Sequence, residues 1–86
     1  MIDILLVDDE PRMLDLLSLY LTPRGYHCIK ATSGKEAISL VEAKEFRLLL
    51  LDIMMPEMNG WETCNKIREF SSVPIIMLTA RDDTQD

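Results

Sequence analysis

The sequence contains few of the residues that build several common kinds of site. Its 86 residues include 2 cysteines, 1 histidine and 3 glycines. The cysteines, Cys28 and Cys64, have no CxxC spacing, which argues against a disulfide framework or a zinc site and favours buried thiols in a reducing cytoplasm. The histidine, His27, begins a short and partly polar segment, so we expect a surface or partly packed side chain rather than a metal ligand.

Basic residues and long apolar runs are also scarce. The chain has 9 lysines and arginines against 15 acidic residues, and its formal charge of −6 would repel nucleic acid or an anionic membrane. The amino terminus lacks the basic region of a signal peptide, and no segment approaches transmembrane length. The composition, 48% hydrophobic and 28% charged, is that of a globular domain. We therefore expect one cytoplasmic domain that binds neither a membrane nor, by itself, DNA.

An apolar run in the middle of the chain ends in a single carboxylate. Leu48 to Leu51 precede Asp52, and four successive leucines are typical of a strand buried on both faces, as in a parallel sheet. Pro56 and Gly60 follow, and both favour a turn. A carboxylate at the tip of a buried strand, next to a loop, indicates a functional residue.

Other apolar segments alternate with helical patterns on both sides of this run. We predict strands at residues 2–7, 26–31 and 75–78, with the second near a sheet edge and the last buried on both faces. Helices are expected between successive strands. The order β-α-β-α-β-α-β predicts an α/β fold with a doubly wound parallel sheet and helices on both faces.

The helix limits and buried faces also follow from the sequence. Ser33 with Glu36, and Asn59 with Glu62, have the spacing of a capping box, and Gly25 is expected to end the first helix. The buried face predicted for the first helix consists of Met13, Leu16, Leu17, Tyr20 and Leu21. That predicted for the third helix consists of Trp61, Cys64 and Ile67.

Residues with reactive or ligating oxygens follow three of the predicted strands. Asp8 and Asp9 follow the first, Asp52 ends the third and Thr79 follows the fourth, so all four are expected at one edge of the sheet. Converging carboxylates repel one another unless a cation lies between them, and an all-oxygen site favours Mg²⁺. Beside that ion, Asp52 is placed as a nucleophile toward phosphorus, and the Thr79 hydroxyl can donate to a phosphoryl oxygen.

The same residue types also occur in other kinds of site. Taken alone, Asp8 and Asp9 suit a solvated cap of the first helix equally well, although their combination with Asp52 and Thr79 favours a site. A phosphatase of the haloacid-dehalogenase type needs a second aspartate two positions after the nucleophile, where this chain has Met54. A nucleotide-binding fold needs a glycine-rich loop after the first strand, where this chain is acidic.

Three segments, residues 7–10, 51–60 and 78–80, resemble the signature segments of bacterial response-regulator receiver domains. They occur in the family's order, and the resemblance covers the whole chain. It implies a flavodoxin-like sheet of strand order 2-1-3-4. It also implies a phosphorylation-dependent switch of a two-component system, which accepts a phosphoryl group from a sensor histidine kinase and controls an output, expected to be transcription. Such a domain is not a turnover enzyme.

The resemblance assigns a role to each site residue. Asp52 matches the phosphoacceptor, Asp9 a direct Mg²⁺ ligand, and Asp8 an acidic partner that acts largely through water. Met54 matches the position whose backbone carbonyl binds the metal, and Thr79 matches the switch hydroxyl.

The family pattern extends further than this sequence. After the fourth strand it continues with a helix, a fifth strand ending in a lysine, an aromatic switch residue and a final helix. Residues 1–86 are therefore interpreted as the N-terminal part of a receiver domain, truncated after the fourth strand. The family's lysine has no counterpart, because Lys35, Lys44 and Lys66 all lie in predicted helices.

Two expectations follow from this truncation. The open edge of the fourth strand is expected to promote self-association, by edge pairing or by exchange of elements between chains. DNA would be bound only by an absent output domain, expected to be a winged helix. The alternative function is an interaction or dimerisation module that takes no phosphoryl group.

Overall fold

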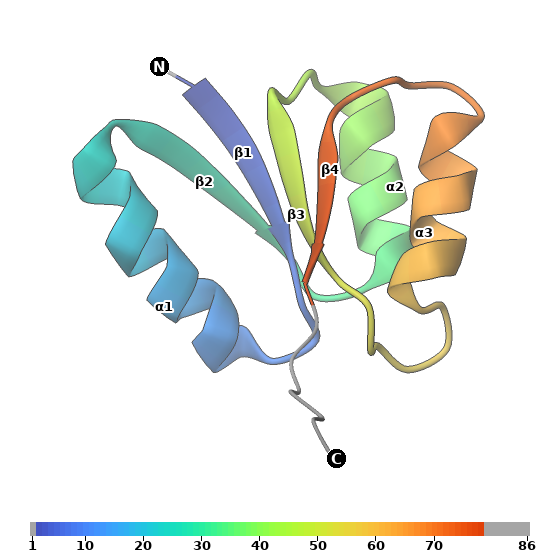
Figure 1. The fold of residues 1–86 in the computed structure, drawn as a ribbon, viewed down its shortest axis with the longest axis horizontal. Coiled ribbons are helices and arrows are strands. Elements are labelled where there is room, and N and C mark those ends of the chain that lie inside the picture. Colours follow the sequence, from blue (N-terminus) through green and yellow to red (C-terminus); the bar gives the residue numbers. More distant parts are fainter. Residues whose placement is uncertain (1, 79–86) are drawn as a thin grey trace, which may run out of the picture.

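The computed structural model describes residues 2–78 as a parallel sheet with helices on both faces (Figure 1). The strands are β1 (Ile2–Val7), β2 (Tyr26–Ala31), β3 (Leu48–Asp52) and β4 (Ile75–Leu78). The helices are α1 (Pro11–Leu21), α2 (Gly34–Ala43) and α3 (Gly60–Arg68), with a short 3₁₀ turn, η1 (Thr22–Arg24), after α1. None of these helices has the length and apolar character that a membrane crossing requires. The predicted alternation of strands and helices is confirmed.

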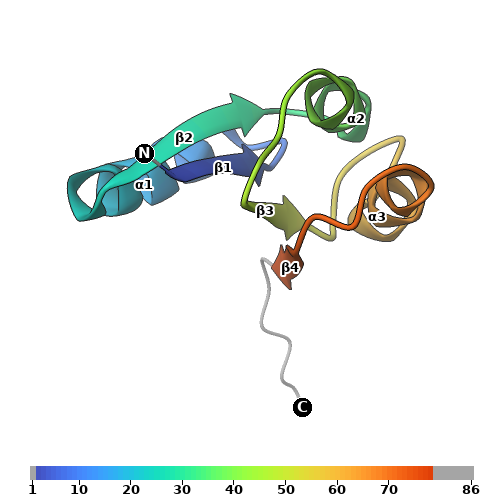
Figure 2. The ribbon, with the colours of Figure 1, turned by 90° about the horizontal axis from the view of Figure 1, so that it is seen from above.

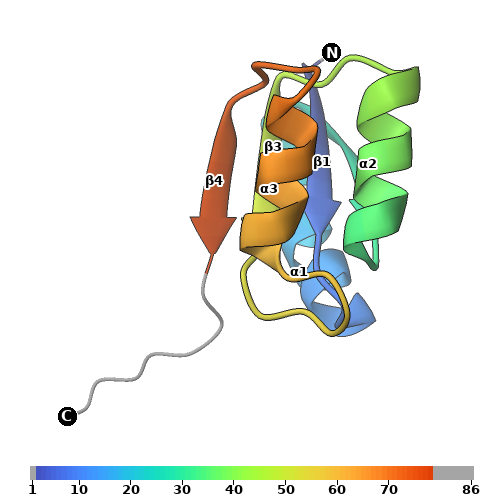
Figure 3. The same cartoon turned by 90° about the vertical axis from the view of Figure 1, so that its right-hand side faces the viewer.

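The four strands lie in the order β2-β1-β3-β4 and are all parallel. β2 is an edge strand, as predicted. Figure 3 shows α2 and α3 together on one face of the sheet, with α1 behind it. The chain moves from β1 to β2 on one side and then to β3 on the other, so the winding direction reverses at β1. The predicted doubly wound, flavodoxin-like fold is confirmed.

Side-chain alternation along β1 divides the core into two parts. Leu5 and Val7 face α2 and α3, whereas Ile4 and Leu6 face α1. β3 follows the same rule, with Leu49 and Leu51 in the larger core. A strand alternates its side chains between the two faces of the sheet. A strand with apolar residues at every position therefore fits a sheet whose two faces are both covered by helices.

The buried face of α1 differs from the predicted one. Leu14 is the residue of α1 that is buried against the sheet, with Leu17 and Leu21 partly buried beside it. Met13, Leu16 and Tyr20, which were predicted to be buried, are 38%, 60% and 60% exposed. α1 carries two adjacent apolar stripes, and the contact of Leu14 with Ile4 and Leu6 turns only one of them toward the sheet. Figure 2 shows α1 along the part of the sheet formed by β1 and β2.

The predicted caps are present with one change. Asn59 and Glu62 form a complete capping box at α3. At α2, the Ser33 hydroxyl accepts the Glu36 N–H at 3.1 Å, but the Glu36 carboxylate accepts the N–H of Thr32 instead of closing the box. Gly25 is the predicted left-handed cap, with φ of 94°, although η1 intervenes between it and α1. Capping residues thus fix the starts of α2 and α3 locally.

At the amino-terminal edge of the sheet, Asp3 is fully paired. Its carboxylate contacts His27 Nδ1 at 2.9 Å and Lys44 Nζ at 2.8 Å, and its carbonyl accepts the N–H of Arg47 at 2.9 Å. The hydrogen bond from Lys44, followed by that from His27, lowers the pKa of Asp3. This network ties β1 to β2 and to the connection between α2 and β3, and it confirms that His27 is a surface residue.

The sheet face on the α1 side is only partly covered near β4. Leu50 is partly buried, and Ile76 is 50% exposed. The prediction that residues 75–78 are buried on both faces is therefore wrong at Ile76. The physical reason is that α1 lies over β1 and β2, so no helix among residues 2–78 covers this side of β4.

Candidate functional site

Three carboxylates gather where β1 and β3 end. Val7 lies opposite Leu51 in the parallel register, so Asp8, directly after β1, comes beside Asp52, the last residue of β3. One carboxylate oxygen from each of Asp8, Asp9 and Asp52 lies within 4.8 Å of the other two. The structure thus brings together three of the residues predicted to form a site.

Two of these carboxylates are buried and held by the backbone. Asp8 is 8% exposed and Asp52 is 4% exposed, whereas Asp9 is exposed. Asp8 Oδ1 accepts the N–H of Glu10 at 2.9 Å, and Asp52 Oδ1 accepts the N–H of Met54 at 3.2 Å. Glu10 is the N-cap residue of α1, so Asp8 bonds to the loop rather than to an N–H inside the helix. A simple helix cap does not account for Asp8.

The buried carboxylates are electrostatically unfavourable without a cation. Burial raises the pKa of Asp52, the hydrogen bond from Met54 partly offsets the rise, and the charges of Asp8 and Asp9 add to it. Burial likewise raises the pKa of Asp8, again against one backbone hydrogen bond. Among residues 2–78, the ion pairs involve other residues, so no basic side chain neutralises this cluster.

The loop after Asp52 returns closely to the strand it leaves. Gly60, the first residue of α3, donates its N–H to the Ile53 carbonyl at 2.9 Å. A Cβ atom at position 60 would lie 2.5 Å from the Asp52 carbonyl oxygen and 2.7 Å from Ile53 Cα. Only glycine fits this contact without a shift of the backbone. The start of α3 is therefore held directly against the end of β3.

The residues at this edge fit a hard divalent cation. All their ligand atoms are oxygens, two of the carboxylates are buried with no basic partner within residues 2–78, and Asp9 is exposed to solvent. Mg²⁺ prefers such oxygen ligands and keeps several waters. The Met54 carbonyl remains a predicted ligand, and Thr79 lies outside the described residues. Leu78, which precedes it, pairs with Asp52 in the sheet.

Residues 4–86 match the response regulator receiver domain family. The chain belongs to this family. Receiver domains are signalling domains of two-component response regulators, and the resemblance carried by the three sequence segments is confirmed. So are the α/β fold and the strand order 2-1-3-4.

Two relatives of this receiver domain are transcriptional regulators by name. The uncharacterized transcriptional regulatory protein YrkP of Bacillus subtilis is 48% identical over 83 residues, which cover 96% of this chain and 36% of YrkP. The transcriptional regulatory protein SrrA of Staphylococcus aureus is 42% identical over 81 residues, covering 94% of this chain and 34% of SrrA. The chain thus spans about a third of the length of these relatives.

A solved structure with the same fold contains a metal. The response regulator TrrA of Thermotoga maritima, crystallised in complex with Mg²⁺ and BeF, is 39% identical and superposes with a TM-score of 0.88. The match covers 94% of this chain and 71% of the TrrA chain.

Trp61 is the residue near the site whose position the sequence did not predict. It was expected in the core but is 58% exposed, and with Met54 and Asn59 it lines a hollow of about 490 Å³ beside the Asp52 loop. Ile67 is buried as predicted and Cys64 packs partly buried against the core, but the buried face of α3 also contains Gly60 and Thr63. Gly60, Thr63 and Ile67 have helical spacing, which would have revealed the correct face if Gly60 and Thr63 had been counted as core positions.

We predict that Asp52→Asn stabilises the metal-free receiver domain. In EDTA at pH 7 it should raise the free energy of unfolding by about 1 kcal/mol, because a buried and repelled charge is removed. Since burial raises the pKa of Asp52 in the folded chain, this gain is present above that pKa and vanishes below the unfolded value, ordinarily 3.8. Urea unfolding across this pH range measures it.

The control for this prediction is Glu57→Gln, which removes one exposed charge from the same loop. Its effect on the free energy of unfolding should stay within about 0.5 kcal/mol. A destabilised Asp52→Asn variant at pH 7 would contradict the account of the buried charge.

Proposed function

We propose that this receiver domain is a phosphorylation-dependent switch in which Asp52 accepts a phosphoryl group from a phosphohistidine of a sensor histidine kinase. The observation that carries the proposal is the cluster of Asp8, Asp9 and Asp52 at the carboxyl edge of β1 and β3. Membership of the receiver family and the Mg²⁺–BeF complex of TrrA support it.

The reaction is a transfer between two nucleophiles. A carboxylate oxygen of Asp52 forms a bond to phosphorus as the bond between phosphorus and the donor imidazole nitrogen breaks, and the leaving nitrogen keeps the electron pair. Oδ1 is already hydrogen-bonded to the Met54 N–H, which orients the carboxylate. The product is an acyl phosphate at the tip of β3.

The residues proposed to hold Mg²⁺ are Asp9, Asp8, Asp52 and the Met54 carbonyl. Asp9 is exposed and suits direct coordination, whereas Asp8 is buried, bonded to Glu10 and suited to act largely through water. When bound, the ion neutralises charge on the transferring phosphoryl oxygens. The Thr79 hydroxyl is proposed as the switch group that turns toward the phosphoryl group.

The proposed output is regulation of transcription. YrkP and SrrA are transcriptional regulatory proteins of about three times this chain's aligned length, which supports a DNA-binding portion outside it, proposed as a winged helix. The chain would then be the N-terminal part of a receiver domain in a longer regulator, and a switch rather than a turnover enzyme.

The alternative function is an interaction or dimerisation module without phosphotransfer. The lysine of the family pattern has no match among residues 1–86. The buried carboxylates argue for phosphotransfer, because an interaction surface alone does not require uncompensated charge at the end of β3.

Incubation with Mg²⁺ and acetyl phosphate, followed by intact-protein mass spectrometry, tests phosphotransfer. The chain should gain the mass of one phosphoryl group, Asp52→Ala should gain none, and Glu57→Gln should react like the unaltered chain. An adduct that survives Asp52→Ala would remove Asp52 from its role. If the chain stays unmodified while a chimera extended with the following segment of YrkP reacts, the interaction module is favoured.

Mg²⁺ binding is tested through Trp61 fluorescence. Trp61 and Met54 line the same hollow, so a change in the Asp52 loop on metal binding should alter the emission of Trp61. Loss of a charged ligand in Asp9→Asn should weaken Mg²⁺ binding about tenfold or more. Asp15→Asn, which alters an exposed acid on α1 outside the cluster, is the control. Equal affinities for Asp9→Asn and the unaltered chain would exclude Asp9 as a ligand.

We also propose that the chain self-associates through β4. Within residues 2–78, β4 has a sheet neighbour on one side only, and its Ile76 is half exposed. Light scattering at micromolar concentration should show a dimer, and Ile76→Lys should shift it to monomer, because the new charge faces the contact. Leu19→Lys, an exposed site on α1, is the control. A monomeric unaltered chain contradicts the proposal, and a dimer that resists Ile76→Lys indicates exchanged elements instead.

A further inference from the structure

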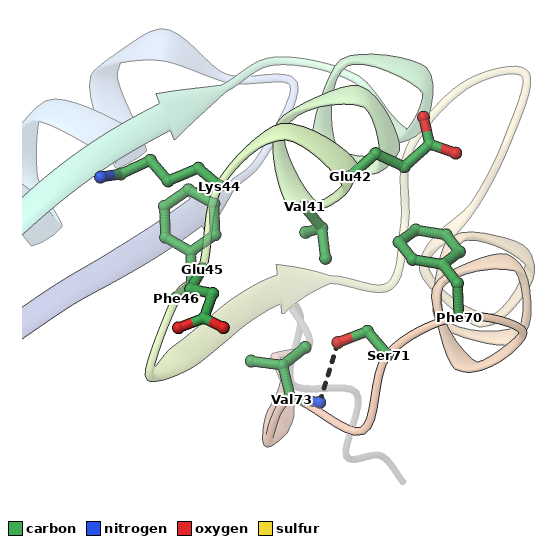
Figure 4. Close-up of a pocket in the computed structure, with 8 residues that line it drawn as sticks. All are labelled: Val41, Glu42, Lys44, Glu45, Phe46, Phe70, Ser71 and Val73. Atoms are coloured by element: carbon green, nitrogen blue, oxygen red, sulfur yellow. Dashed lines mark hydrogen bonds between the residues drawn. The ribbon is translucent and has the colours of Figure 1, made fainter.

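A groove of about 510 Å³ opens at the end of the sheet opposite to Asp52 (Figure 4). It lies between the connection from α2 to β3 and the connection from α3 to β4. Its lining includes Val41, Glu42, Glu45, Phe46, Phe70 and Val73. Because these residues lie at the end of α2 or on the segments that precede β3 and β4, the groove is separate from the carboxylate cluster.

The groove has an apolar floor and an exposed aromatic wall. Val41 and Val73 are partly buried against the larger core, and Phe46 is 8% exposed. Phe70, just after α3, is 44% exposed, and Figure 4 shows its ring at the side of the groove opposite Phe46. The Phe70 N–H donates to Ile67 and the Val73 N–H donates to Ser71 Oγ, so the backbone around the ring is fixed.

The charges around this floor are predominantly negative. Lys44 also lines the groove, but its ammonium is paired with Asp3 at 2.8 Å and lies 5.8 Å from the centre of the Phe46 ring. Among residues 2–78, Glu42 and Glu45 form no ion pair or side-chain hydrogen bond. The last turn of α2 contains no basic residue, so its terminal carbonyl dipoles add to the negative potential.

The nearby cation on α3 does not reverse this balance. Arg68 donates from Nη1 to the Ser71 carbonyl at 3.2 Å, at the α3 side of the groove. Arg68 thus supplies one positive charge against the two carboxylates of Glu42 and Glu45, which have no ion-pair partner among residues 2–78. The charges of Lys44 and Asp3 neutralise each other. The Phe70 ring has no cation over it in the described part of the chain, unlike the Phe46 ring.

We propose that this groove docks an arginine side chain from a basic segment of a partner protein. A guanidinium can stack on the exposed face of Phe70 while its N–H groups donate to Glu42, Glu45 or the carbonyls that end α2. The neighbouring apolar side chain of the partner packs on Val41 and Val73. Since the groove and Asp52 lie at opposite ends of the sheet, the docked side chain touches none of the three carboxylates, and docking requires neither Mg²⁺ nor a phosphoryl group.

The probe is a blocked peptide of sequence Ala-Arg-Leu-Arg-Ala, titrated into the ¹⁵N-labelled 86-residue chain without Mg²⁺. The amide signals of Val41, Phe70 and Val73 should shift saturably, and the affinity should fall as salt rises. A peptide with glutamate in place of arginine should cause no such shifts. Absence of shifts at millimolar peptide, or shifts centred elsewhere, overturns the proposal.

Variants identify the groups responsible. Glu42→Gln combined with Glu45→Gln should weaken the binding of the arginine peptide about three- to tenfold, because two exposed carboxylates are removed. Phe70→Leu keeps an apolar side chain but removes the ring, and should weaken the binding of the peptide about threefold. Glu10→Gln combined with Glu57→Gln removes two charges at the other end of the sheet and should leave the affinity for the peptide unchanged.

The outcomes separate docking in the groove from attraction to the net charge. Equal weakening by the control pair of substitutions would mean that only overall charge matters and would overturn the proposal. Equal affinity for a lysine version of the peptide would overturn the stacking of a guanidinium on Phe70. The same spectra report whether each variant is folded.

Discussion

The pairing of β1 with β3 is the constraint on which the candidate site depends. The strands are parallel and Val7 lies opposite Leu51, so Asp8 and Asp52 must share one edge of the sheet. A slip of one residue in β1 would separate these carboxylates and would also turn Leu5 and Val7 from the larger core to the smaller one. The same alignment therefore specifies both the core and the site.

Acidic residues have opposite environments at the two ends of the sheet. At the amino end, Asp3 has two basic partners and a lowered pKa. At the carboxyl end, Asp8 and Asp52 are buried, lack a basic partner among the described residues and have raised pKa values. The first arrangement joins structural elements, and the second retains an unfavourable charge that a cation would relieve.

Features with local chemical signals were predictable from the sequence. The buried leucine run, the Asn59 capping box and the strand-end position of Asp52 each depend on residue type and spacing. The orientation of α1 was not predictable, because it has two apolar stripes and only packing on Ile4 and Leu6 selects Leu14. The same limit applied to Trp61 of α3, because the buried face of this helix combines the predicted Ile67 with the small residues Gly60 and Thr63. Proximity of the carboxylates followed from strand topology, whereas their burial required the structure.

The contact between Gly60 and the end of β3 also joins distant parts of the molecule. The first turn of α3 lies against the Asp52 carbonyl, and Phe70 follows the last turn of the same helix. A helix is stiff along its axis and a close-packed contact transmits strain, so a displacement of the Asp52 backbone must carry α3 with it. The helix is thus a mechanical link between the phosphoacceptor candidate and the opposite end of the sheet.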